Sequence, residues 1–408
     1  MSLSRDILIR AAAEYGTPLF VYDGDAVIQH YRSLYDYIPW PQLRIHYAMK
    51  ANYNYQLLRR LSAVGACIDA VSPGDVVMAR KAGFPVDRIL YTANNMTEAE
   101  MAAVHAAGVL MNIGELSRLE KFGQAFPGSR VCVRFNPDVK DGDSKNTMTG
   151  GDLTKFGILL EQADRVVAIA RNYQLHIVGL HEHTGSGIQR TESVYQSMRN
   201  LMAVATKERF PELEFLDFGG GFKVPYKPGE HRIDYAAFGA EIVRLFQEFC
   251  RQYGRDLGMY FEPGKYTVAE SGCLLVTVNT LKDNHGRLIA GTDSGFPQLI
   301  RPVLYGAYHH LRNLSNPDGA VKLYDVCGNI CETGDLFAEQ RELPEIREGD
   351  LLAIDNAGAY CYSMGGVYNL RPMPAEVLIE AGQITLARRR LTAAELVDQI
   401  IGESSCRS

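Results

Sequence analysis

The sequence predicts an α/β fold in which a TIM-like (β/α)8 barrel is followed by an all-β domain, either a β-barrel or a sandwich. Two observations support this prediction. Up to Glu262, short apolar runs of strand length alternate with segments of helical periodicity, which is typical of a parallel sheet. After Glu262 the chain changes to strand-like runs separated by turns, with few helices. An open, doubly wound sheet is the alternative for the first part.

The barrel prediction depends on the number of apolar runs, because eight strand and helix units match a closed barrel of about 250 residues. The candidate strands are Leu43–Ala48, Ile68–Val71, Ile89–Thr92, Val109–Asn112, Val131–Phe135, Ile177–His181, Phe215–Phe218 and Met259–Glu262. The helical segments between them are Asn54–Val64, Gly74–Ala82, Thr97–His105, Glu161–Tyr173, Ser193–Lys207 and Phe238–Tyr253. We therefore expect residues 26–265 to form the barrel.

The β domain is expected to contain residues 1–25 together with residues 266–408. Its candidate strands are Cys273–Thr280, Arg287–Ala290, Lys322–Val326, Leu351–Ile354 and Glu376–Ile379. A terminal helix is expected over Ala393–Ile401. Thr17–Tyr22 has strand character and precedes the first barrel strand, so it can add a strand to this domain.

Charge and composition indicate a small-molecule ligand. The chain has 42 basic and 48 acidic side chains, a formal charge of −6, and no basic tract, so neither nucleic acid nor an anionic membrane is an expected partner. No apolar run approaches the ~18 residues of a membrane span, and the first residues do not form an apolar signal. The eight cysteines are scattered without zinc spacing, which favours reduced thiols. We expect a cytoplasmic protein.

The mouth of the predicted barrel is where reactive groups should collect, because barrel active sites lie at the carboxyl ends of the strands. Lys50 directly follows the run Ile45–Met49 at the end of the first strand. An amine there can be partly desolvated and nucleophilic, which suits a Schiff base. For a lysine taken alone, a solvated strand end is the alternative.

Two motifs follow the sixth and seventh strands. His183 can lie flat on an aromatic ring, and Ser186, beside glycines, can donate a hydrogen bond to phosphate. The His181 and His183 pair also raises the possibility of a metal site, but no third ligand follows at suitable spacing, so none is expected. Gly219–Gly221 can wrap an anion with backbone N–H groups, although glycine runs also make plain turns.

The eighth strand ends in Glu262-Pro263-Gly264-Lys265. Glu262 can accept a hydrogen bond from a protonated ring nitrogen, and Lys265 can balance negative charge. Taken in isolation, this tetrapeptide is a turn.

The later part of the chain places a guanidinium, phenols, a thiol and a carboxylate in β surroundings, at Arg301, Tyr305, Cys331, Glu332 and Tyr360. Each one alone has a structural alternative, such as a surface ion pair, a core aromatic or a buried thiol. Their common order along the chain favours a functional interpretation.

With these motifs, the chain resembles the fold-type III pyridoxal-phosphate-dependent decarboxylases over nearly its whole length, and within them the branch that acts on diaminopimelate. The segment His46–Asn52 resembles the cofactor-lysine motif. The resemblance implies pyridoxal 5'-phosphate bound by Lys50, Asp69, His183, Ser186, Gly219, Gly220, Gly221, Glu262, Gly264, Lys265 and Tyr360. It implies substrate contacts from Lys265, Arg301, Tyr305, Glu332 and Tyr360.

The resemblance also implies catalytic roles for four residues. Lys50 carries the cofactor, His183 stacks on its ring, Glu262 pairs with the ring nitrogen, and Cys331 is the proton donor. The implied assembly is a homodimer with shared active sites, in which the Cys331–Glu332 loop reaches into the partner's site.

The motifs depart from the family pattern at three places. Lys265 stands where arginine is usual, and it offers a point charge without a bidentate fork. Glu182 precedes His183, and Gly187 follows Ser186 where glutamine is common. Asp75 stands where glutamate is usual.

The implied reaction is decarboxylation of meso-2,6-diaminoheptanedioate to L-lysine and carbon dioxide in lysine biosynthesis. A relative acting on ornithine, lysine, arginine, a carboxylated polyamine or a siderophore precursor is the nearest alternative, and Arg301 disfavours substrates with a simple cationic side chain. A non-catalytic homologue that binds the cofactor is a second alternative, which the presence of Lys50, Cys331 and Glu262 disfavours. A barrel aldolase that uses a lysine imine is a third, but it leaves the β domain without a role.

Overall fold

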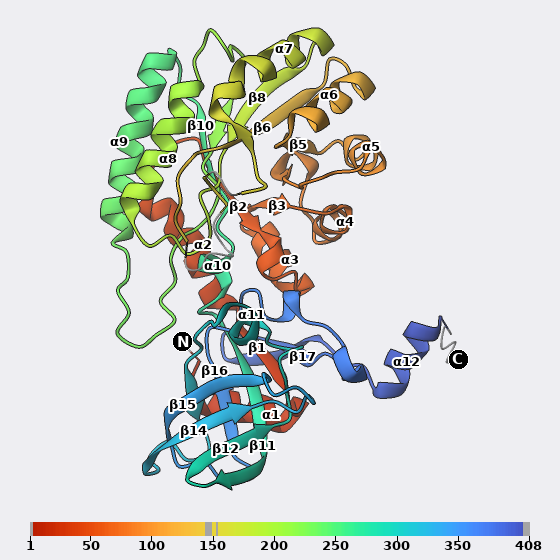
Figure 1. Ribbon diagram of the computed structural model, residues 1–408, viewed down its shortest axis with the longest axis vertical. Helices are drawn as coiled ribbons and strands as arrows, with labels where there is room; N and C mark the ends of the chain where they lie inside the picture. Colours follow the sequence, from red (N-terminus) through yellow and green to blue (C-terminus); the bar gives the residue numbers. More distant parts are fainter. Residues whose placement is uncertain (1–2, 143–148, 152–153, 403–408) are drawn as a thin grey trace. The chain divides into compact units, whose positions relative to one another are not determined.

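The computed structural model describes residues 3–142, 149–151 and 154–402 (Figure 1). The chain divides into two compact units. One contains Ile28–Val224 and His231–Thr267, and the other contains Met1–Val27, Pro225–Glu230 and Val268–Ser408. The boundaries expected from the sequence were 26 and 265 in place of 28 and 267, and they assigned Pro225–Glu230 to the barrel.

In the described part of the first unit, eight parallel strands close into a barrel. They are β2 (Leu43–Ala48), β3 (Cys67–Ala70), β4 (Ile89–Tyr91), β5 (Leu110–Ile113), β6 (Arg130–Asn136), β8 (His176–His181), β9 (Phe215–Asp217) and β10 (Gly258–Phe261). β10 pairs with β2, and β5 pairs with β6 to complete the ring. The short β7 (Ile158–Leu159) adds to β6. The predicted (β/α)8 barrel is confirmed, and the open-sheet alternative is wrong.

Helices cover the outside of the barrel strands (Figure 1). They are α2 (Gly24–Tyr37), α3 (Tyr55–Ala63), α4 (Pro73–Lys81), α5 (Glu98–Ala106), α6 (Leu116–Ala125), α7 (Ala163–Tyr173), α8 (Thr191–Val204) and α9 (Tyr235–Tyr253). Several begin at a capping side chain, as at Ser72 and Asp234, which accept hydrogen bonds from the first-turn N–H groups. Helices α2 and α6 were not predicted. In α6 the interior Gly123 weakens the sequence signal, yet a Cβ there would lie 2.6 Å from the Tyr173 ring.

The second unit is built on a mixed β-sheet. Its strands are β1 (Leu19–Asp23), β11 (Gly272–Asn284), β12 (Arg287–Thr292), β13 (Leu311–Asn313), β14 (Val321–Cys327), β15 (Leu336–Pro344), β16 (Leu351–Ile354), β17 (Ala375–Glu380) and β18 (Gln383–Arg388). β1 pairs antiparallel with β11 and parallel with β17, so the N-terminal strand joins this sheet as expected. The predicted β domain is confirmed, although β13, β15 and β18 were not predicted.

Helices also belong to the β unit. α1 (Arg5–Tyr15) was not predicted, and its Leu8 and Ala11 join a buried cluster with Leu19, Val377 and other strand residues. The short α11 (Arg301–Tyr305) follows β12 in the chain, and α12 (Ala393–Ile401) has the predicted bounds.

Two general properties follow from the described residues. None of their helices is both long and apolar enough to cross a membrane. The seven cysteines among them are all free thiols.

Candidate active site

Lys50 lies at the mouth of the barrel, in the single 3-10 turn Met49–Ala51 that follows β2. Its Nζ forms an ion pair with Asp69 Oδ2 on the neighbouring strand β3, where Asp69 is paired in register with Ala48. The Lys50 side chain is 41% exposed and Asp69 is fully buried. Burial raises the pKa of the Asp69 carboxyl to about 6, with Glu262 acting in the same direction and Lys50 opposing it. The amine is therefore accessible and held by a buried acid.

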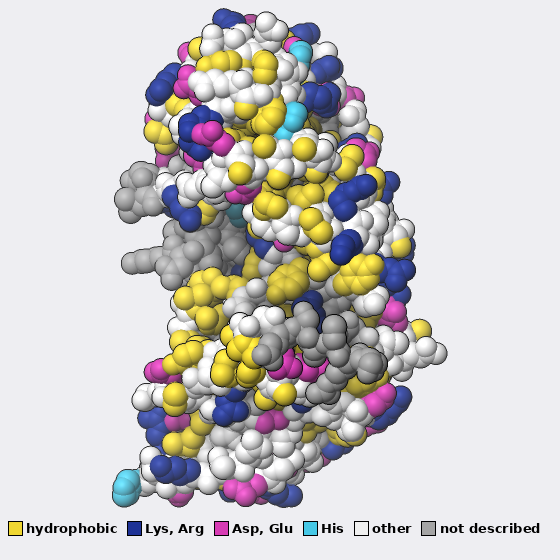
Figure 2. Space-filling view, turned by 90° about the vertical axis from the view of Figure 1, so that its right-hand side faces the viewer, with side chains coloured by type: hydrophobic (Ala, Val, Ile, Leu, Met, Phe, Trp, Pro, Cys, Tyr) yellow, Lys and Arg dark blue, Asp and Glu magenta, His cyan; other side chains and the backbone are white. Residues whose placement is uncertain are grey.

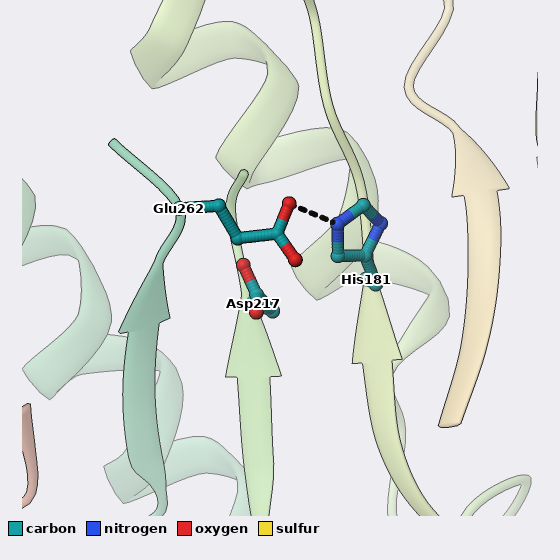
Figure 3. A group of neighbouring side chains, drawn as sticks. All are labelled: His181, Asp217 and Glu262. Atoms are coloured by element: carbon teal, nitrogen blue, oxygen red, sulfur yellow. Dashed lines mark hydrogen bonds and ion pairs between the residues drawn. The ribbon is translucent and has the colours of Figure 1, made fainter. Parts of the chain in front are cut away.

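His181, Asp217 and Glu262 come together from the ends of three adjacent strands, β8, β9 and β10 (Figure 3). His181 Nε2 lies 3.1 Å from Glu262 Oε2, and His181 is the register partner of Asp217. Burial lowers the pKa of His181 well below its usual value, and burial raises the pKa values of Glu262 and Asp217. The hydrogen bond between the neutral imidazole and the carboxyl fixes Glu262 in orientation.

The three groups also have a spacing that could suit a metal ion, because their ligand atoms lie within 4.8 Å of one another. In the sequence, His181 and His183 were the candidate pair of metal ligands. In the structure the two histidines have different partners, since His183 Nδ1 accepts a hydrogen bond of 3.2 Å from the Gly220 N–H. The hydrogen bond between His181 and Glu262 already accounts for their proximity without a metal.

Gly219–Gly221 form a tightly enclosed cradle after β9. A Cβ on Gly219 would lie 2.6 Å from His183 Nδ1, and one on Gly220 would lie 2.4 Å from the Glu262 carbonyl oxygen. Gly219 and Gly221 have φ values of +64° and +96°, which only glycine adopts without strain. Asp217 Oδ1 accepts a hydrogen bond of 2.9 Å from the Gly219 N–H and fixes the first turn. Such a backbone cradle fits a phosphate.

The other predicted cofactor residues of the barrel unit come before and after this cradle in the sequence. Ser186 is half-buried in the loop after β8, and Lys265 is buried at the start of the short helix α10 (Lys265–Val268). Gly264 allows a close approach, because a Cβ there would lie 3.0 Å from the Ala51 Cβ, beside Lys50.

Two buried ionisable residues of the barrel unit were missed as functional residues. Arg134 on β6 lies 4.9 Å from the centre of the Phe156 ring, and burial lowers its pKa while the nearby Glu262 and Asp69 carboxyls oppose that shift. A charged residue inside the apolar run Val131–Phe135 was the signal that could have identified it.

Glu182 was noted only as a departure from the family pattern. It is fully buried and accepts hydrogen bonds from Ser197 Oγ at 2.6 Å and from Thr184 Oγ1 at 3.3 Å. Burial raises its pKa to about 8. Because Ser197 lies on α8, Glu182 joins this helix to the segment that carries His183.

The remaining predicted residues lie in the β unit. Arg301 is buried at the start of α11, with its guanidinium carbon 5.0 Å from the Tyr226 ring and 5.9 Å from the Tyr305 ring. Cys331 and Glu332 are exposed in the loop after β14. Tyr360 is partly buried and has a φ of +56°. The predicted site residues thus form two groups, one in each unit.

The barrel group fits pyridoxal phosphate. Asp69 Oδ1, Asp217 Oδ2 and His181 Nδ1 are buried without a hydrogen-bond partner among the described residues. A nucleophilic amine, an anion cradle and a buried carboxylate are also the three groups that the aldehyde, the phosphate and the ring nitrogen of this cofactor require.

Comparison with known proteins agrees with this chemistry. Residues 25–269 match the family of the pyridoxal-dependent decarboxylase, pyridoxal binding domain. The chain is 42% identical to diaminopimelate decarboxylase of Methanothermobacter thermautotrophicus, over 95% of this chain and 92% of that protein. The chain belongs to the diaminopimelate decarboxylase family. The resemblance drawn from the sequence motifs is thereby confirmed, and so is pyridoxal phosphate as the cofactor.

Other members of the diaminopimelate decarboxylase family match over similar lengths. The enzyme of Escherichia coli K12 is 32% identical, over 97% of this chain and 96% of that protein. The crystal structure of diaminopimelate decarboxylase from Helicobacter pylori complexed with L-lysine matches with a TM-score of 0.90 and 28% identity, covering 97% of this chain and 99% of that one. The matches cover both units of the chain, so members of this family contain both.

Proposed function

We propose that this chain decarboxylates meso-2,6-diaminoheptanedioate to L-lysine and carbon dioxide, with Lys50 as the attachment point of pyridoxal phosphate. The observation that carries the proposal is the Lys50–Asp69 ion pair at the barrel mouth. Lys50 follows β2, which pairs with β10, the strand that precedes Glu262. A buried acid beside a half-exposed amine keeps that amine in place, and the family membership supplies the reaction class.

Each part of the cofactor has a matching group in the barrel. Ser186 and Gly219–Gly221 would hold the phosphate, His183 would lie against the ring, and Glu262 would accept a hydrogen bond from the protonated ring nitrogen. A cation beside a buried carboxyl favours its ionised form, so the bound ring counteracts the raised pKa of Glu262. When bound, the cofactor accepts the electron pair that carbon dioxide leaves behind. Gly264, Lys265 and Tyr360 are its further proposed contacts.

The substrate is recognised through its two ends. Arg301 binds the distal carboxylate by a two-point hydrogen bond, which a planar guanidinium provides and an ammonium does not. Tyr305 assists Arg301, and Glu332 offers a carboxylate to the distal ammonium. Lys265 and Tyr360 are the further substrate contacts of this proposal. Cys331 delivers a proton to the carbon that has lost carbon dioxide, a contribution typically worth about 10²–10⁴-fold in rate.

The active protein is a homodimer in this proposal, with the Cys331–Glu332 loop of one chain serving the partner's barrel. The exposed position of this loop supports the idea. So do the exposed apolar side chains of the β unit, among them Leu370 at 55% and Ile400 and Ile401 at 58% each. Hydrophobic side chains also gather in patches on the face shown in Figure 2. The free thiols are consistent with a cytoplasmic location.

The test is carbon dioxide release from a panel of diamino acids by the full-length protein loaded with pyridoxal phosphate. We expect release from meso-2,6-diaminoheptanedioate, and little from its LL isomer, L-lysine, L-ornithine or L-arginine. Borohydride reduction should fix the cofactor on the peptide that contains Lys50. Lys50→Ala should abolish both results, and Lys282→Ala, on an exposed hairpin, should change neither. Preferential release from ornithine or lysine, or label on another lysine, would refute the proposal.

A further inference from the structure

A short segment of the β unit, residues 368–371, holds the loop that carries Cys331. Asn369 Nδ2 donates a hydrogen bond to Cys331 Sγ at 3.3 Å. Tyr368 OH donates to Glu332 Oε1 at 3.1 Å, and Arg371 Nη2 donates to the carbonyl oxygen of Asn329 at 3.1 Å. Cys331 and Glu332, the two residues of this loop with proposed roles in the reaction, are thus each held by a hydrogen bond from one residue of the segment.

The backbone of this segment is strained where it presents Asn369. Asn369 has a φ of +57° and Leu370 a φ of +53°, so two successive non-glycine residues are left-handed. Asparagine tolerates this region, but leucine adopts it only with backbone strain. Leu370 is 55% exposed, so burial of its side chain does little to offset this strain. Strain of this kind is concentrated at functional sites, where the geometry itself is needed.

We propose that Asn369 is a positioning residue for Cys331, and that its amide holds the sulfur in place and stabilises the negative charge that forms there. In the reaction the Cys331 S–H bond breaks, its proton goes to the substrate carbon, and the electron pair stays on sulfur as a thiolate. Water returns the proton before the next cycle. The inference rests on the proposed function for the role of Cys331, whereas the contacts belong to the β unit alone.

The chemistry of the two donors suits this arrangement. The Asn369 amide does not ionise at neutral pH, so it stabilises the thiolate without competing with Cys331 as the acid. A donor that meets a charge developing in the transition state lowers the barrier more than one that meets a neutral group. Tyr368 remains a donor because its hydrogen bond to Glu332 raises the pKa of the phenol.

The test compares Asn369→Gly and Asn369→Asp with the unaltered full-length protein loaded with pyridoxal phosphate. Glycine removes the amide and keeps the left-handed backbone without strain. Aspartate keeps the shape but presents carboxylate oxygens to the sulfur. The measurement is the rate of alkylation of Cys331 by iodoacetamide at pH 7 and pH 10, followed by mass spectrometry of the peptide. The thiolate is the reacting form, so this ratio reports how well the negative sulfur is stabilised.

We expect the pH 7 to pH 10 rate ratio to fall about threefold in Asn369→Gly, and further in Asn369→Asp, since each loses a hydrogen bond to a charged atom. The kcat for the diamino acid should fall about tenfold in both variants, with little change in KM. Asn95→Gly is the matched control, because Asn95 is an exposed left-handed asparagine of the barrel unit. Tyr368→Phe should leave the alkylation ratio unchanged, since it removes only the contact to Glu332.

An unchanged alkylation ratio in both Asn369 variants would overturn the inference, whether or not the protein releases carbon dioxide. A changed ratio with an unchanged kcat would also overturn it, because the contact would then play no part in the reaction. Failure of the unaltered protein to release carbon dioxide from any diamino acid would instead refute the proposed function, and the alkylation ratios would still decide whether Asn369 stabilises the sulfur.

Discussion

The guanidinium carbon of Arg301 lies 5.0 Å from the centre of the Tyr226 ring, and the Tyr226 ring packs edge-on against His309 at 5.4 Å. Tyr226 belongs to Pro225–Glu230, which follows the glycine cradle in the sequence but packs with the β unit. A guanidinium beside an aromatic ring is held by attraction to the ring electrons, and stacking fixes the plane whose edge carries the N–H donors. We therefore regard Tyr226 as an orienting support for the proposed carboxylate-binding arginine.

Replacing Tyr226 should weaken substrate binding without affecting the cofactor. We expect Tyr226→Leu to raise the KM for meso-2,6-diaminoheptanedioate about fivefold, because a partly desolvated cation–π contact contributes roughly 1 kcal/mol. Tyr226→Phe keeps the ring and should behave nearly as the unaltered protein. Steady-state kinetics and a titration with pyridoxal phosphate measure the two quantities. If phenylalanine is as harmful as leucine, the ring contact is not what matters.

Arg301→Lys should raise the KM for the same substrate more than tenfold, since lysine keeps the charge but loses the planar two-point hydrogen bond. The affinity for pyridoxal phosphate should stay within about twofold. Arg347→Lys, at an exposed arginine of the β unit, is the matched control and should change neither quantity. Equal losses of substrate and cofactor affinity in Arg301→Lys would mean that Arg301 supports the fold instead.

The positions of the barrel strands were predictable because each strand is buried on both faces and appears as an apolar run bounded by turn residues. Lys50 and Glu262 could be expected at the mouth because Lys50 directly follows such a run and Glu262 ends one. Arg134 was missed because the sequence shows a charge inside an apolar run but does not show the buried carboxyls of Glu262 and Asp69 that favour its charged form. Ser197 of α8 donates a hydrogen bond to the buried Glu182, and no spacing rule in the sequence connects these two residues.

The sequence also does not show with which of the two units a loop packs. Pro225–Glu230 lies between two barrel elements, and only tertiary packing assigns it to the β unit with Arg301. Asn369 and Cys331 are 38 positions apart in loops without periodicity, so their hydrogen bond could not be inferred. Strained left-handed residues such as Leu370 leave no sequence signal, because local propensity argues against them.

Stability should depend on pH through Glu182, whose pKa is raised from 4.5 to about 8 by burial. Between these two values the unfolded chain loses the proton and the folded chain keeps it, so stability falls as pH rises from about 4.5 to 8 and then levels off. Glu182→Gln mimics the protonated form and should remove this dependence, for a gain on the order of 5 kcal/mol at pH 9, since each pKa unit corresponds to about 1.4 kcal/mol. Urea unfolding of both proteins at pH 5, 7 and 9 measures it.

The exposed Glu161→Gln provides the control for the Glu182 experiment, since it removes a carboxylate from the same unit without touching a buried one. We expect Glu161→Gln to follow the unaltered protein at all three pH values. A Glu182→Gln advantage that is the same at pH 5 and pH 9 would show that the carboxyl is already ionised in the folded protein, and the pH argument would fail.

Subunit exchange tests whether the two groups of site residues act in different chains. Cys331→Ala and Lys50→Ala should each be nearly inactive alone, and a mixture allowed to exchange should regain about a quarter of the unaltered activity. Random exchange makes half of the dimers mixed, and each mixed dimer has one site with both residues intact and one with both missing. Tagging one variant by mass verifies that exchange occurs. Complete exchange with no recovery would mean that Cys331 serves its own chain, because only then does every site keep one lesion.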